Sequence, residues 1–154
     1  MADANQIEHA VEHFEEGYLC SQSVLLAYAE KLEIDPGTAA RIAAPFGAGI
    51  AYTGNTCGAV TGALMAIGLR YGHDMPEDER SKREMFDKLD AFLAAFEGLH
   101  GSVLCRALLG QDVSTDQGLK TAREEDLFDT LCPGYVEDAA RLLGEILAQD
   151  DGEA

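Results

Sequence analysis

Positively charged residues are scarce in this chain of 154 residues, which has 11 Lys and Arg against 28 Asp and Glu and a formal net charge of −17. A protein with this excess of negative charge repels phosphate groups, so we expect it to bind neither nucleic acid nor an anionic membrane surface. The acidic residues are spread along the chain rather than gathered in one block. This distribution is typical of solvated helix faces.

Long hydrophobic runs are also missing. The longest, residues 59–69, is interrupted by Thr61, Gly62 and Gly68, and it is far shorter than the roughly 20 residues that span a bilayer. Residues 1–6 are polar and acidic, without the basic and apolar regions of a secretory signal. We therefore expect a cytoplasmic protein with no membrane insertion, in which thiols stay mostly reduced.

Close cysteine pairs are absent as well. The four cysteines are Cys20, Cys57, Cys105 and Cys132. No two of them form a Cys-x-x-Cys pair, which argues against a zinc ribbon, a bacterial ferredoxin and a thioredoxin-like active site. Neither a P-loop nor a nucleophile elbow occurs. With 47% hydrophobic residues, the chain can bury a core without disulfide bonds. What remains is a chemical site that tertiary folding assembles from four separate segments.

Helical periodicity dominates, and no period-two strand pattern occurs. One face of the first expected helix carries Ile7, Ala10, Val11 and Phe14. A long helix after Pro76 presents a core face of Phe86, Leu89, Phe92, Leu93 and Phe96. These patterns predict an all-α, single-domain bundle of six to eight helices over residues 1–154, with a frayed tail at about 150–154.

Three of the cysteines lie at expected helix starts. Cys20 lies just before or within the first turn of the second helix, Cys57 opens the fourth, and Cys132 lies in a break before the last. Helix starts offer free N–H groups and a partial positive charge, which lower the pKa of a thiol and favour the thiolate. Cys105 is expected inside a short helix over about 102–109. We expect these helix ends to converge, so that the four sulfurs share one site.

Glycines accompany the cysteines. Gly58 and Gly62 follow Cys57 on one helix face, where another backbone can approach closely and where Gly58 leaves room beside the sulfur. Gly47 and Gly49 lie in an expected loop whose N–H groups could reach the cysteine site. We treat these four glycines as candidate cofactor-contacting positions. The stripe of small residues could instead pack against a second copy and form a homodimer.

Taken together, these residues resemble the C_GCAxxG_C_C family of redox-active proteins, which is defined by four separated cysteines and a Cys-Gly-Ala-x-x-Gly motif. The motif here is residues 57–62. Similar sequences surround the other family positions at 17–24, 44–50, 105–106 and 132–133. The resemblance covers about residues 10–147. It implies redox activity, and related domains suggest an iron–sulfur centre.

The residues themselves leave three chemistries open. In the first, all four cysteines are metal ligands of an iron–sulfur cluster of unknown nuclearity, and the protein is an oxidoreductase or electron carrier with a donor or acceptor protein as partner. In the second, there is no metal, and Cys57 is the reactive thiolate of a thiol–disulfide redox protein. In the third, the chain binds structural zinc or is a helical interaction protein with buried thiols.

Overall fold

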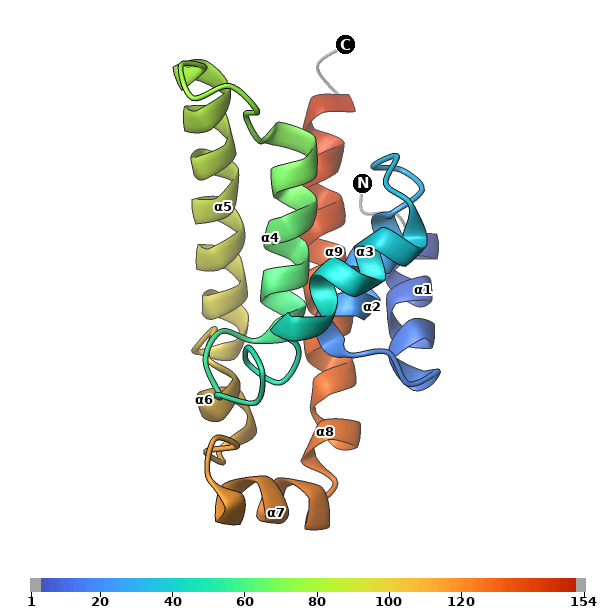
Figure 1. Ribbon diagram of the computed structural model, residues 1–154, viewed down its shortest axis with the longest axis vertical. Coiled ribbons are helices and arrows are strands. Elements are labelled where there is room, and N and C mark those ends of the chain that lie inside the picture. The colour runs from blue at the N-terminus through green and yellow to red at the C-terminus, as the bar shows by residue number, and fades with distance from the viewer. Residues whose placement is uncertain (1–3, 152–154) are drawn as a thin grey trace.

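The computed structural model describes residues 4–151, and these form helices joined by turns, with one isolated bridge (Figure 1). The elements are α1 (Ala4–Glu15), α2 (Cys20–Tyr28), α3 (Pro36–Ala43), the 3-10 helix η1 (Ala44–Phe46), α4 (Gly58–Tyr71), α5 (Glu79–His100), α6 (Cys105–Leu109), α7 (Asp116–Glu124), α8 (Leu127–Thr130) and α9 (Cys132–Asp151). The predicted all-α fold is confirmed. Eight of the described α-helices have at least five residues, and α8 is a single turn.

The C-terminal helix continues to Asp151, beyond the expected start of the frayed tail. The rest of that expected tail, residues 152–154, lies outside the described residues. None of the helices in the described part of the chain is both long and apolar enough to cross a membrane.

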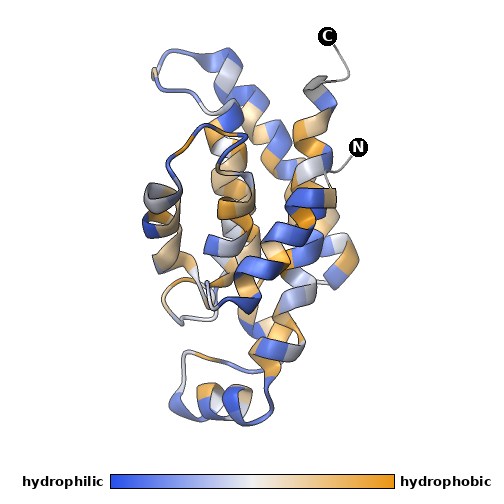
Figure 2. Cartoon of the chain, turned by 90° about the vertical axis from the view of Figure 1, so that its right-hand side faces the viewer, coloured by the Kyte–Doolittle hydropathy of each residue, from blue (hydrophilic) through white to orange (hydrophobic). Residues whose placement is uncertain are grey.

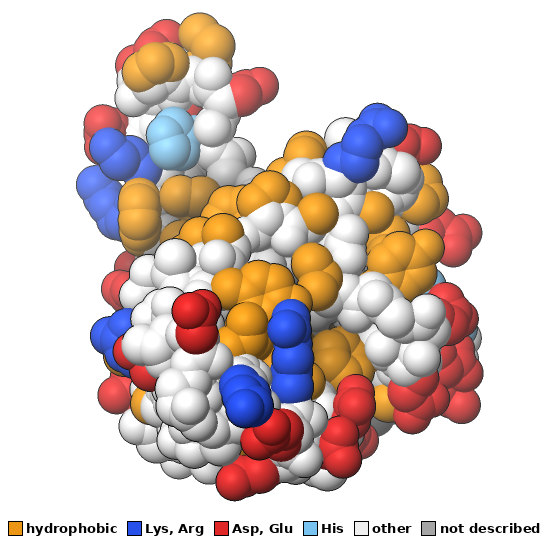
Figure 3. Space-filling model, turned by 60° about the horizontal axis from the view of Figure 1, so that its bottom comes forward, with side chains coloured by type: hydrophobic (Ala, Val, Ile, Leu, Met, Phe, Trp, Pro, Cys, Tyr) orange, Lys and Arg blue, Asp and Glu red, His pale blue; other side chains and the backbone are white. Residues whose placement is uncertain are grey.

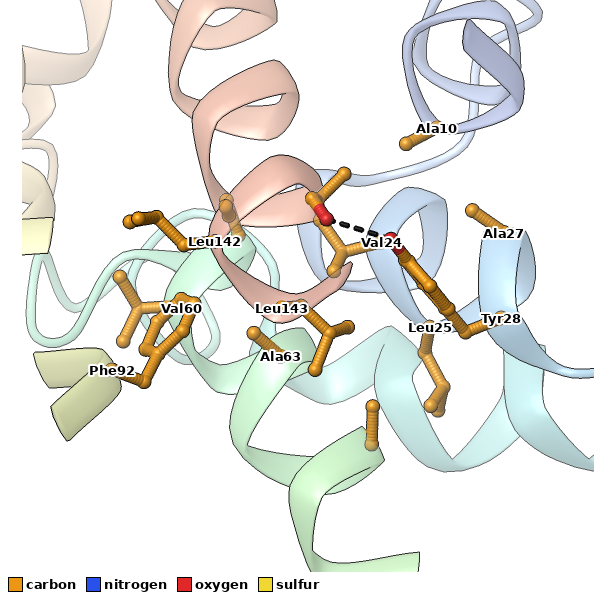
Figure 4. Packing of buried hydrophobic residues seen from close by; sticks show 14 of the residues in the cluster. Ala10, Val24, Leu25, Ala27, Tyr28, Val60, Ala63, Phe92, Leu142 and Leu143 are labelled. Carbon is orange, nitrogen blue, oxygen red and sulfur yellow. Dashed lines mark hydrogen bonds between the residues drawn. The ribbon is translucent and has the colours of Figure 1, made fainter. Parts of the chain in front are cut away.

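The main hydrophobic core lies where α2, α4, α5 and α9 meet, with α1 packed against α2 and α9 (Figure 1). Its largest fully buried side chains include Tyr28, Phe92, Phe96, Leu25, Ile67 and Leu143. The hydroxyl of Tyr28 donates a hydrogen bond to the carbonyl of Ala140 at 2.7 Å and so joins α2 to α9 (Figure 4). A partner at this position avoids the cost of a buried, unsatisfied hydroxyl. In Figure 2 most helices carry both hydrophilic and hydrophobic stretches, as expected for helices that bury one face.

Helix α5 begins and ends at recognisable caps. The side chain of Asp78 accepts a hydrogen bond from the N–H of Ser81 at 3.0 Å, and the helix ends at Gly101 with φ of 81°. Phe92 and Phe96 are fully buried, as predicted, but Phe86 is 50% exposed. The prediction for Phe86 is wrong because α5 packs mainly on α4 and α9, so only a narrow stripe of it is covered.

A second, smaller core lies below the main bundle, where α6, α7 and α8 gather at the bottom of Figure 1. It buries Cys105, Leu109, Val113 and Ala122. Phe128 and Cys132 are partly buried against it. The sequence predicts one helix running toward residue 131, but the chain turns at Asp126, whose φ is 53°, and two helices result.

Helices α2 and α4 approach closely because Gly62 lacks a side chain. A Cβ atom at Gly62 would lie 2.5 Å from the carbonyl oxygen of Ser21. Ser21 is itself fully buried, and its hydroxyl donates to the carbonyl of Ala43 at 2.7 Å. The predicted stripe of small residues therefore packs within the chain at this crossing.

We predict that Gly62→Ala lowers the free energy of unfolding by about 1–3 kcal/mol, because the added methyl group must push α2 and α4 apart. The matched control is Gly68→Ala on the same helix, where a Cβ would meet nothing within 4 Å. That control should raise the free energy of unfolding by about 0.5–1 kcal/mol. Chemical denaturation measures both, and equal effects of the two substitutions would contradict the close approach.

Candidate four-cysteine site

Each of the four cysteines lies at the start of a helix. Cys20, Cys105 and Cys132 are the first residues of α2, α6 and α9, and Cys57 is the N-cap of α4. The expected break at Cys132 is thus the first turn of α9, where the following proline is tolerated.

The prediction of an internal helix position for Cys105 is wrong. The preceding residues are held outside the helix, since Leu104 donates its N–H to the hydroxyl of Ser102 at 3.0 Å and pairs with Thr56 in an isolated antiparallel bridge.

That bridge also fixes Cys57 beside Cys105. The N–H of Cys57 donates to the carbonyl of Val103 at 2.7 Å, and the N–H of Cys105 donates to the carbonyl of Asn55 at 2.6 Å. The two segments are 48 residues apart in the chain, so this short ladder determines how closely two of the four cysteines approach. Backbone hydrogen bonds of this kind are directional and leave little freedom in the relative placement of the two residues.

All four cysteines line a single cavity of about 280 Å³. Cys57 and Cys105 are each only 7% exposed and form its floor, whereas Tyr18 and Tyr52, at 40% and 42%, stand at its mouth. The rest of the wall is mostly apolar or aromatic and includes Phe14, Leu19, Ala48, Leu108, Leu109, Phe128 and Tyr135. In Figure 3, which brings the lower end of Figure 1 forward, hydrophobic side chains gather around a hollow with Lys and Arg side chains beside them.

Backbone N–H groups surround the sulfur of Cys20. Those of Ser21, Ala48 and Gly58 are directed at it and lower its pKa, although not enough to offset burial. A Cβ atom at Gly58 would overlap this sulfur. Glycine at that position is therefore required for Cys20 to sit against the first turn of α4.

Burial raises the pKa of every cysteine in the cavity. The pKa of Cys57 rises to about 12, chiefly through burial and then through the charge of Cys20, against the opposing effect of the N–H groups of Ala59 and Val60. The pKa of Cys105 rises to about 11, and those of Cys20 and Cys132 are raised for the same main reason. The expectation that helix starts lower these pKa values is wrong for the metal-free protein. Loss of water outweighs the N–H groups that reach Cys20 and Cys57, and no such groups lower the pKa values of Cys105 and Cys132.

Residues 48–52 form one left-handed turn beside the cavity. Their φ angles are 53°, 70°, 68°, 51° and 62°, and four of the five residues are not glycine. Left-handed backbone costs such residues about 1–2 kcal/mol each. Hydrogen bonds hold the turn, among them Ala51 N–H to the carbonyl of Pro45 and Asn55 N–H to the carbonyl of Gly49, each at 2.9 Å. Strain of this kind is typical of segments that position functional groups, and here the turn directs the N–H of Ala48 at Cys20 and brings Tyr52 to the mouth.

The four candidate glycines have different places. Gly58 lines the cavity. Gly49 lies behind it, where a Cβ would come within 2.7 Å of the Cβ of Cys105. Gly47 packs against Leu19 and Gly62 against α2, so both contact segments next to Cys20 rather than the cavity itself.

The wall residues that sequence reasoning missed include Arg123 at the end of α7 and the α8 residues Phe128 and Asp129. No local motif marks them. They reach the cavity only because the second core folds α7 and α8 back beneath the main bundle. Within residues 4–151, no three Cys, His, Asp or Glu side chains are grouped closely enough to hold a single metal ion.

An all-α fold with one cysteine at each of four converging helix starts defines a class of helical four-cysteine proteins. A family model described as Putative redox-active protein (C_GCAxxG_C_C) matches residues 18–146, so the chain belongs to that family. The resemblance drawn from the cysteines and the motif is therefore confirmed, and the family description supports redox activity. No curated protein and no solved structure matches the chain.

We predict that the thiols of the metal-free, reduced protein react slowly with iodoacetamide near pH 8. A pKa raised from 9.0 to about 12 lowers the thiolate fraction of Cys57 about a thousandfold at that pH. Mass spectrometry should show alkylation at least about tenfold slower in the folded protein than in denaturant, with the folded rate increasing as pH rises. Equal rates in the two states would contradict the burial of these sulfurs.

We also predict that Ala51→Gly stabilises the protein. Ala51 is exposed and has φ of 51°, so glycine should relieve about 0.5–1 kcal/mol of net strain at the left-handed turn. Ala94→Gly is the control, since Ala94 is exposed inside α5 and the same exchange there should cost about 1 kcal/mol. Thermal unfolding distinguishes the two, and destabilisation by Ala51→Gly would refute the strained turn.

Proposed function

We propose that Cys20, Cys57, Cys105 and Cys132 hold an iron–sulfur cluster and that the protein transfers electrons through it. One observation carries this proposal, namely that four thiols from four remote helix starts line one largely apolar cavity. Cysteine thiolates are the usual ligands of such clusters, and burial and hydrogen bonds to sulfur set their reduction potentials.

The placement of the four thiols around one cavity wall supports a cluster over a structural zinc ion. Zinc–sulfur bonds of about 2.3 Å bring tetrahedral ligands to within about 4 Å of one another. No group of three potential ligands in the described residues is arranged for a single ion. A cluster places several iron atoms and sulfides between its cysteines and so accepts ligands that are spread around a cavity wall.

The protonation of the thiols also supports a metal centre. Buried thiols with raised pKa values lose their protons when a metal ion supplies the compensating positive charge. A thiol–disulfide enzyme would instead need Cys57 as a free thiolate near neutral pH. The pKa of Cys57, raised to about 12, argues against that alternative.

The chain would contribute more than four ligands. The bound cluster supplies one-electron transfer. The N–H groups of Ser21, Ala48 and Gly58 would donate hydrogen bonds to the Cys20 sulfur and stabilise negative charge on that side. The apolar walls would limit water at the cluster and thereby tune its potential.

One observation favours a second candidate function. The sulfur of Cys20 lies against the peptide that joins Cys57 to Gly58. The charge of Cys20 also acts on Cys57 more strongly than that of Cys105 does. If no metal binds, Cys20 is therefore the candidate partner for a disulfide with Cys57, and the test below distinguishes it.

We predict that anaerobic reconstitution with ferrous iron and sulfide gives a protein with visible absorption and bound iron. Cys57→Ser and Cys105→Ser should each lower cluster occupancy at least about tenfold. Ala94→Ser introduces the same residue at an exposed site of α5 and should not change it. A colourless protein without bound iron, with a reversible Cys20–Cys57 disulfide in its peptide map, would replace the cluster by the second candidate.

A further inference from the structure

The cavity extends outward beyond the cysteines. Its inner end is formed by the buried residues Ala48, Cys57, Gly58 and Cys105, with Cys20 and Cys132 half-buried beside them. Its outer end carries the exposed side chains of Tyr18, Tyr52 and Arg123. Iron and sulfide at the inner end would leave this outer end open. The whole cavity, at about 280 Å³, is close to the lower limit of roughly 300 Å³ for small-molecule pockets, so it suits only a small compound, about the size of one aromatic ring.

Arg123 is the one positively charged residue that lines the described cavity. Its guanidinium carbon lies 6.0 Å from the centroid of the Tyr52 ring, at the outer range of a cation–π contact. None of the carboxylates in the described residues forms an ion pair with it, in a protein that has 28 Asp and Glu.

The surroundings of Arg123 restrict what it can bind. The guanidinium edge matches a carboxylate with two parallel hydrogen bonds. The adjoining walls include Phe14, Tyr18 and Phe128, which favour a flat apolar body. Asp129, three residues before Cys132, also lines the cavity. Its negative charge repels an anionic group placed beside it, so the acid group of a ligand is favoured at Arg123.

We propose that the outer end of this cavity binds a small carboxylate with a flat, apolar body, with its acid group on the edge of Arg123 and its body directed toward the cysteines. The inference deepens the proposed function and rests on it for the role of the compound as a substrate that meets the cluster. The recognition itself depends only on the cavity wall.

Three ring compounds of matched size serve as probes, namely benzoate, benzyl alcohol and benzylammonium. We expect benzoate to bind at least about tenfold more tightly than either of the others at low ionic strength, as one charge-assisted bidentate contact predicts. Titration calorimetry measures the affinities, and amide chemical shifts locate the site. The shifts should centre on Tyr18, Tyr52, Arg123 and Phe128.

Substitutions separate a specific contact from general attraction. Arg123→Gln should lower benzoate affinity about tenfold, to the level of benzyl alcohol, and Arg123→Lys should give an intermediate value because it keeps the charge but loses the fork. Arg83→Gln is the charge-matched control, since Arg83 is exposed on α5 and does not line the cavity. Circular dichroism confirms that each variant is folded.

The metal-free and the reconstituted protein allow the carboxylate site and the cluster to be tested separately. Benzoate binding to the metal-free chain tests the carboxylate site alone. A shift of the visible spectrum on adding benzoate to the reconstituted protein tests whether the compound reaches the cluster.

Equal affinity for benzoate and benzyl alcohol, or equal losses of benzoate affinity in Arg123→Gln and Arg83→Gln, would overturn the carboxylate site. Failure to incorporate iron while benzoate still binds through Arg123 would overturn the cluster alone.

Discussion

The burial of four thiols in one cavity is the constraint on which the surrounding structure depends. Each cysteine lies at a helix start, and separate contacts position these helix starts around the cavity. The absence of a side chain at Gly58 leaves room for the sulfur of Cys20 against α4. The hydrogen bonds of the Thr56–Leu104 bridge set Cys57 beside Cys105. Packing against the small core beneath the bundle places Cys132 at the cavity.

Two opposing electrostatic effects meet at these sulfurs. Helix starts and the left-handed turn direct N–H groups at Cys20 and Cys57, which favours negative charge there. Removal from water disfavours that charge, and it is the larger effect. The N–H groups therefore favour thiolates at this site, but burial keeps the thiols protonated in the absence of a cationic partner. A cationic partner that replaces the thiol protons would use both features, because it compensates the burial and benefits from the N–H groups.

Much of this arrangement is visible in the sequence, and the exceptions have physical causes. The helices follow from apolar periodicity, and the importance of the cysteines follows from their spacing and the motif at 57–62. The helix start at Cys105 is hidden because a partner segment 48 residues away creates it. The left-handed turn is hidden because Ala48, Ile50 and Tyr52 have no local preference for positive φ. Arg123 reaches the cavity through the folding of α7 and α8, which no local pattern encodes.

The cysteines divide evenly between the two hydrophobic cores. Cys20 and Cys57 belong to the main core, and Cys105 and Cys132 belong to the smaller one below it. A cofactor bound to all four would act as a cross-link between the two cores, in addition to the helices α6 and α9 that contribute to both. The lower unit, with its short helices and few buried residues, would gain the most from that link. Cofactor insertion and the final ordering of α6 to α8 would then be a single coupled event in the maturation of the protein.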